Sequence, residues 1–225
     1  MNTIWFFGDC FTWGFGAQSN EVNDSLGLPH DPYFQSKKDG DKLWTEIVSE
    51  KLNMKEVKPW FGVGAFPWII DIFLNRIEHM KSDDIVVFGD TVPDGVLAYN
   101  RLKDKVASLN CNDFHHNDCY FRSEEEKEKT LPFIEYHKIP HQEKWTEFYK
   151  NQVEKISKEI LNRGIRTFYW SHDIWKKEDR FETITEATDG KIVDPHFSWN
   201  GHRQMAKYIL ELIEQNNYIG KKSLV

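Results

Sequence analysis

"TIWFFGDCFTWG", residues 3–14, begins with an almost uninterrupted apolar run. Such a run predicts a buried strand over residues 3–8, of the kind found in parallel sheets that are covered on both faces. The run stops at Gly8 and Asp9, and the next side chain is the thiol of Cys10. A small nucleophilic residue at the carboxyl end of a buried strand is typical of the mouth of an active site.

Strands and helices alternate along the rest of the chain. Further short strands are predicted at about 56–61, at the apolar run 85–89 and at 165–170. Apolar residues at helical spacing predict helices over 42–53, 67–80 and 200–216. A further helix is predicted to end at Arg163-Gly164, and one of its faces carries Trp145, Phe148, Tyr149, Val153, Ile156 and Ile160. This alternation is typical of the α/β class with a doubly wound parallel sheet, and we expect residues 1–225 to form a single domain.

Two irregular insertions interrupt this pattern, near residues 15–41 and 110–142. Both are polar, and loops of this length inside a compact domain usually have a function. Each adjoins the predicted carboxyl end of a strand, so we expect the insertions to flank a substrate cleft. The expected lining residues of that cleft are Asp9, Phe15, Tyr33 and Phe114.

Composition narrows the possible partners and the location. The net charge of −7 argues against a nucleic-acid partner, which requires a basic face. The start of the chain has neither the cationic segment nor the long apolar stretch of a signal peptide or membrane span. An odd number of cysteines, 3, fits a reduced compartment, so the sequence predicts a cytoplasmic protein without a membrane partner. It leaves the oligomeric state open.

A second informative stretch, VDPHFSWNGH at residues 193–202, precedes the last predicted helix. Asp194 and His196 are two residues apart, on the same side of an extended turn. The carboxylate can therefore hold one imidazole nitrogen and leave the other facing a cleft. A nucleophile needs such a base, and the base needs a partner that fixes its tautomer. Cys10, His196 and Asp194 are thus the candidate catalytic residues.

Four blocks of this chain resemble those of the SGNH (GDSL-type) hydrolase family. They are FFGDCFTWG at 6–14, PWFGVGAF at 59–66, IVVFGDTVPD at 85–94 and DPHFSWNGHRQMA at 194–206. They follow the order of the family's blocks and, with their flanks, extend from Ile4 to about Ile213. Cys10 stands where the family has its serine nucleophile.

The resemblance implies a flavodoxin-like SGNH architecture and an ester hydrolase, an esterase or deacylase, or an acyltransferase. It places the oxyanion hole at the backbone N–H groups of Cys10 and Gly64, with Gly62 the next choice. Thr91 stands where the family uses an asparagine amide as a third donor. The implied substrate is a small-molecule or carbohydrate ester, and neither a cofactor nor a metal is implied.

Departures from the family pattern leave alternatives open. Loss of one oxyanion donor typically costs about 2.7–4 kcal/mol of transition-state stabilisation, so Thr91 weakens the expected site. The spacing from Asp194 to His196 is one residue shorter than the commonest form. Cys10 is equally explained as a natural thiol nucleophile and as a substitution of an original serine. The altered residues also suit a non-catalytic binding protein with the same fold.

Other chemical patterns are weaker. The cysteines and histidines of residues 111–119 match no standard spacing of a zinc site. Residues 171–173 spell Ser-His-Asp, but consecutive side chains diverge, so we interpret them as a loop. The glycines between Gly8 and Gly16 lack the spacing of a dinucleotide fingerprint. His202, in the first turn of the last predicted helix, is expected to be structural or surface-facing.

Overall fold

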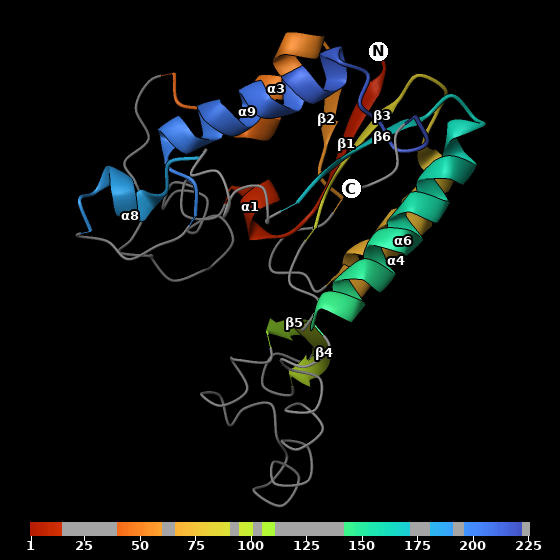
Figure 1. Ribbon diagram of the computed structural model, residues 1–225, viewed down its shortest axis with the longest axis horizontal. Helices are drawn as coiled ribbons and strands as arrows, with labels where there is room; N and C mark the ends of the chain where they lie inside the picture. Colours follow the sequence, from red (N-terminus) through yellow and green to blue (C-terminus); the bar gives the residue numbers. More distant parts are fainter. Residues whose placement is uncertain are drawn as a thin grey trace, which may run out of the picture.

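The computed structural model describes residues 1–14, 40–59, 66–90, 95–100, 105–110, 142–171, 181–190 and 196–221. Four parallel strands form its central sheet (Figure 1). Their order is β2-β1-β3-β6, and their bounds are Lys55–Val57, Thr3–Phe7, Ile85–Gly89 and Arg166–Trp170. The predicted α/β class with a parallel sheet is confirmed. β2 ends before the predicted residue 61, and Pro59 lacks the N–H that would continue the ladder.

Helices cover both faces of this sheet (Figure 1). On one side lie α3 (Trp44–Leu52) and α9 (Trp199–Glu214), which pack against each other. On the other side lie α4 (Phe66–Arg76), continued by the 3₁₀ helix Ile77–His79, and α6 (Gln142–Leu161). The sheet is therefore doubly wound, as its alternating strands and helices predicted.

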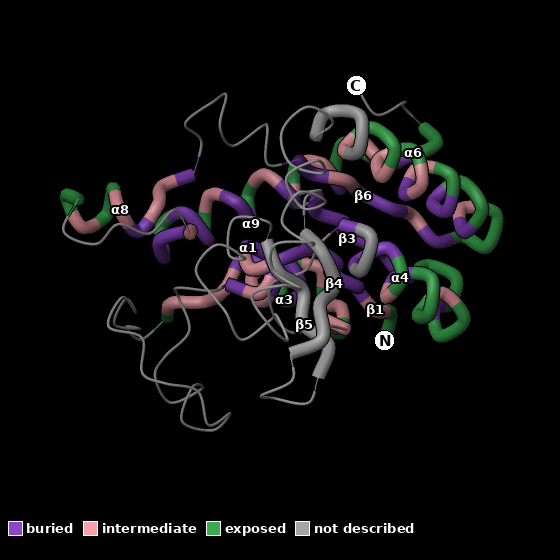
Figure 2. The backbone as a smooth tube through the Cα atoms, turned by 90° about the horizontal axis from the view of Figure 1, so that it is seen from below, coloured by how far each residue is buried: buried purple, intermediate pink, exposed green. Residues whose placement is uncertain are grey.

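Alternate side chains of each strand enter different cores. Ile4 and Phe6 of β1 pack into the core beneath α3 and α9, whereas Trp5 and Phe7 pack into the core beneath α4 and α6. All five residues of β3 are buried. Figure 2 shows the same burial along the strands. Burial on both faces explains why these strands are continuous apolar runs rather than alternating ones.

Several features differ from the sequence-based prediction. Residues 95–110 contain an antiparallel hairpin of β4 (Gly95–Asn100) and β5 (Lys105–Asn110), for which no strand was expected. A short helix, α8 (Ile184–Ala187), was also missed. Phe148, which shares the predicted apolar face of α6 with buried residues, is itself 48% exposed. In the portion that the structure describes, no helix is long and apolar enough to cross a membrane.

The strand order identifies the edge of the sheet where a ligand is expected. From β1 the chain goes to β2 on one side, and β3 then lies on the other side of β1. The crossover connections therefore diverge at the carboxyl ends of β1 and β3, and ligands of doubly wound sheets bind at such a point. The helix that follows β1 at this edge, α1 (Cys10–Trp13), begins with the candidate nucleophile.

Candidate functional site

Asp9 determines the local structure around Cys10. It is the N-cap of α1, and its side-chain Oδ1 accepts a hydrogen bond from the Phe11 N–H at 3.0 Å. Its backbone oxygen accepts from the N–H groups of Thr12 and Trp13, at 3.0 and 3.1 Å. Asp9 was expected to line the cleft, but it is only 4% exposed. Its observed role is to start the helix that carries Cys10.

Gly8 makes the sharp turn from β1 into α1 possible. Its φ is +159°, and a Cβ added there would lie 2.0 Å from the Thr12 Oγ1. The helix thus folds back closely over the strand end, and only a residue without a side chain fits beneath it. This close approach explains the glycine of the Gly-Asp-Cys sequence without any reference to catalysis.

His196 lies beside this turn, although it is far from it in the sequence. Its ring is 4.8 Å from the ring of Phe11, measured between centroids, with an angle of 35° between the planes. Phe11 follows Cys10 directly, and Cys10 is half-buried against the core beneath α3 and α9. The structure therefore brings two of the three candidate catalytic residues into one neighbourhood.

A short antiparallel pairing fixes the backbone of His196. The N–H of Ile184 donates to the His196 oxygen at 2.9 Å, and the N–H of Ser198 donates to the Glu182 oxygen at 3.0 Å. Between them, Thr183 and Phe197 form an isolated β-bridge. The chain then enters α9, for which Ser198 is the N-cap.

His202, in the first turn of α9, is structural and fully buried. Its Nδ1 accepts a hydrogen bond from the Trp44 N–H at 3.4 Å, so the neutral ring carries its proton on Nε2. Nε2 has no hydrogen-bond partner among the described residues. Burial, reinforced by the charges of Lys58 and His196, lowers the pKa of His202 to about 3. Helical spacing could have predicted its burial, because His202 lies three and seven residues before the buried Met205 and Ile209.

Lys58 places a positive charge near α1, and no pattern in the sequence indicates this position. Its Nζ forms an ion pair with Glu56 at 3.0 Å and donates to the Thr45 Oγ1 at 3.2 Å. The same ammonium lies 5.1 Å from the centroid of the Trp13 ring. Since its side chain is only 14% exposed, Lys58 stiffens the contact between the end of β2 and the end of α1.

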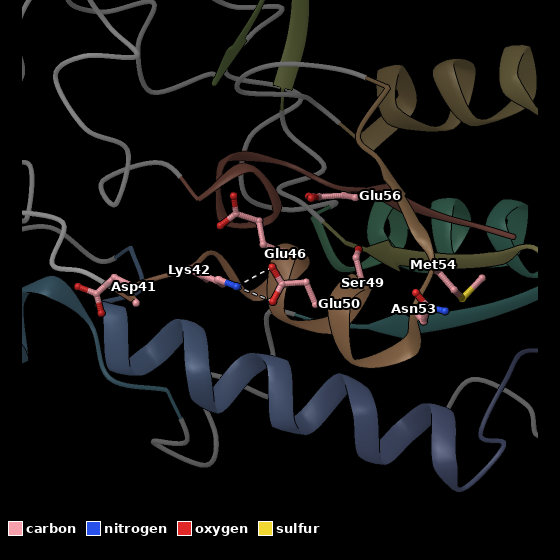
Figure 3. Close-up of a pocket in the computed structure, with 9 residues that line it drawn as sticks. Asp41, Lys42, Glu46, Ser49, Glu50, Asn53, Met54 and Glu56 are labelled. Atoms are coloured by element: carbon pink, nitrogen blue, oxygen red, sulfur yellow. Dashed lines mark hydrogen bonds and ion pairs between the residues drawn. The ribbon is translucent and has the colours of Figure 1, made fainter. Parts of the chain in front are cut away.

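A pocket of about 500 Å³ lies along α3 (Figure 3), and neither Cys10 nor His196 is among the residues that line it. Its wall is rich in carboxylates, but these have partners of their own. Glu50 pairs with Lys42 at 2.6 Å, and Asp41 pairs with Arg203 at 3.1 Å. Glu46 accepts from the backbone N–H of residue 43 at 2.7 Å. These contacts give the three carboxylates structural roles around the start of α3.

The remaining candidate residues lie outside the described residues: Asp194, Gly64, Thr91, Phe15, Tyr33 and Phe114. The same holds for nearly all of the two insertions, for residues 111–119 and for His172 and Asp173. Within the described ranges, no group of three or more His, Cys, Asp or Glu side chains is arranged to hold a metal ion.

Comparison with known proteins adds no family assignment. No family model matches the chain, and no curated protein matches it either.

Proposed function

We propose that this protein is an SGNH-like acyl hydrolase or acyltransferase that acts on a small ester. The observation that carries the proposal is the packing of His196 on Phe11, beside Cys10, at the switch point of the sheet. Two of the blocks that resemble the family thus meet where doubly wound folds bind ligands.

In the proposed reaction, the Cys10 sulfur attacks the acyl carbonyl carbon and His196 takes the thiol proton. Collapse of the tetrahedral intermediate breaks the bond to the alcohol oxygen, to which His196 returns the proton. Water, or a second alcohol, then attacks the thioester and releases the acyl group from sulfur. Asp194 would orient His196, and Gly64 and Thr91 would supply oxyanion donors, as the resemblance implies.

A binding protein with the same fold is the second candidate. Cys10 in place of serine and Thr91 in place of asparagine both favour it, because each weakens the family's chemistry. Retention of Asp194 and His196 favours the enzyme, since a binding protein does not need that pair. A cytoplasmic location and a carbohydrate alcohol in the substrate remain parts of the proposal.

The test is hydrolysis of p-nitrophenyl acetate by the protein and by Cys10→Ser. We expect the serine variant to raise kcat/KM about tenfold or more, because the surrounding apparatus suits a hydroxyl nucleophile with a general base; tenfold corresponds to about 1.4 kcal/mol. His196→Ala in each background should remove the activity, and Cys119→Ser is the matched thiol control. A cysteine form that is faster than the serine form and depends on His196 would make Cys10 a native thiol nucleophile. Absence of turnover in every form would favour the binding protein.

A further inference from the structure

We propose that Glu182 is a positioning residue for His196, holding the imidazole beside Cys10 through the start of α9. This inference rests on the proposed function, because the position of His196 matters for chemistry only if His196 acts as the base. Glu182 lies outside the four blocks of the resemblance, and it is the contacts of its backbone and side chain that point to it.

The Glu182 side chain reaches the N-cap of α9. One carboxylate oxygen accepts a hydrogen bond from the Ser198 hydroxyl. The same Ser198 Oγ accepts from the Gly201 N–H at 3.0 Å. A hydroxyl has one proton to donate and lone pairs to accept with, so both bonds form together. The carboxylate therefore orients the hydroxyl that caps the helix.

The Glu182 backbone is tied to the same turn. Its N–H donates to the Gln204 side-chain oxygen at 2.8 Å, and its oxygen accepts from the Ser198 N–H at 3.0 Å. A Cβ added at Gly201 would lie 2.1 Å from that oxygen, so only glycine lets the two segments approach this closely. Glu182 is thus fixed by both backbone groups and by its side chain.

His196 is held between these contacts and α1. Its own oxygen accepts from the Ile184 N–H, two residues beyond Glu182, and its ring packs on Phe11. A shift of Glu182 relative to α9 would therefore move the His196 backbone while α1 stayed in place. Because proton transfer depends on distances within about 3 Å, even a small shift weakens the pair of His196 and Cys10.

The experiment measures the rate of Cys10 alkylation by iodoacetamide between pH 5 and 9.5, followed by mass spectrometry on the peptide that contains Cys10. This readout reports the thiolate and does not require turnover. If His196 activates Cys10, the rate rises below the usual thiol pKa of about 8.5, and His196→Ala removes this rise. We expect Glu182→Ala to lower the rate at pH 7 at least threefold, towards that of His196→Ala.

Matched variants separate positioning from stability. Glu182→Gln keeps an oxygen that accepts from Ser198, and it should restore at least half of the rate. Glu211→Ala removes an exposed glutamate of α9, paired with Lys207 at 3.9 Å, but leaves Glu182 intact, so its profile should equal that of the unmodified protein. If Glu182→Ala does not fold, Glu182→Asp, one methylene shorter, carries the same expectation.

Two results would overturn the inference, and they differ from each other. An unchanged profile in Glu182→Ala, with the His196→Ala profile altered, refutes the positioning role alone. Identical profiles of the unmodified protein and His196→Ala refute the pair of Cys10 and His196, and the positioning role fails with the proposed function.

Discussion

Acid should destabilise this protein through His202. In the unfolded chain the pKa of the His202 side chain is about 6.5. In the folded protein burial is the main cause that lowers this pKa to about 3, so the folded ring stays neutral where the unfolded ring is protonated. Because the folded-state pKa is lowered, the stability that the neutral ring contributes is complete above pH 6.5 and is lost as the pH falls towards 3. Each pH unit in this window removes up to about 1.4 kcal/mol, and less near pH 6.5, where the unfolded side chain is only half protonated, so acidification from pH 6.5 to 4.5 removes about 2 kcal/mol.

The variant His202→Asn isolates this effect. The asparagine oxygen occupies nearly the same place as the imidazole Nδ1, so it can still accept from the Trp44 N–H, but it does not titrate. Loss of the contacts of the ring with Phe197 and Trp199, now at 5.6 and 5.8 Å between centroids, lowers the stability equally at every pH. The difference in stability between the two proteins should therefore shrink by about 2 kcal/mol from pH 6.5 to 4.5.

Urea unfolding at half-unit pH steps, followed by tryptophan fluorescence, measures this difference directly. Other titrating groups are common to both proteins and cancel in the comparison. The NMR signals of the His202 ring should also remain those of a neutral imidazole down to pH 4.5. Parallel pH dependences in the two proteins, or a His202 ring that titrates near pH 6, would refute the account of a buried neutral histidine.

Two further predictions concern the ends of β1. Asp84 is 3% exposed and accepts from the Trp5 indole N–H at 3.1 Å and from the backbone N–H groups of residues 3 and 81 at 2.8 and 3.0 Å. Asp84→Ala should lower the free energy of unfolding by about 3 kcal/mol, and Asp84→Asn by less. Urea unfolding measures both, and a loss below about 1 kcal/mol in Asp84→Ala would contradict this prediction. Gly8→Ala should lower the free energy of unfolding by about 1–3 kcal/mol, because the added Cβ clashes with Thr12. Adding Thr12→Ala should recover part of this loss in thermal melting; no recovery would mean that the backbone conformation alone is responsible.

The sequence predicted those elements whose burial leaves a local signal. β1 and β3 are apolar runs because both faces of each strand are covered, and α9 shows its buried face at helical spacing. The four-residue helix α8 is too short to show a period, although Thr183 and Glu186 form a capping box at its start. Phe148 followed the same apolar spacing as its neighbours and yet is exposed, because the stripe on α6 is wider than its contact with the core.

The residues of the candidate site were likewise predictable only where a local sequence pattern indicates them. Cys10 and His196 were proposed from the sequence because a nucleophile after a strand and a histidine two residues after an aspartate are local patterns. Glu182 and Lys58 were missed because their roles come from partners brought near by folding. Glu182 meets residues 198–204, and Lys58 meets Thr45 and Trp13. No spacing within the segments that contain them indicates those contacts.

Trp44 joins the two halves of the candidate site. Its indole N–H donates to the Phe11 oxygen at 2.9 Å, and its backbone N–H donates to His202. One fully buried residue of α3 thus ties the helix that begins with Cys10 to the helix that follows His196. Neither of these two bonds involves the Cys10 sulfur, so the link that Trp44 makes between α1 and α9 is kept when serine replaces cysteine. Comparison of cysteine and serine at position 10 therefore tests two nucleophiles within one framework, and a difference in rate between them reports chemistry rather than refolding of the site.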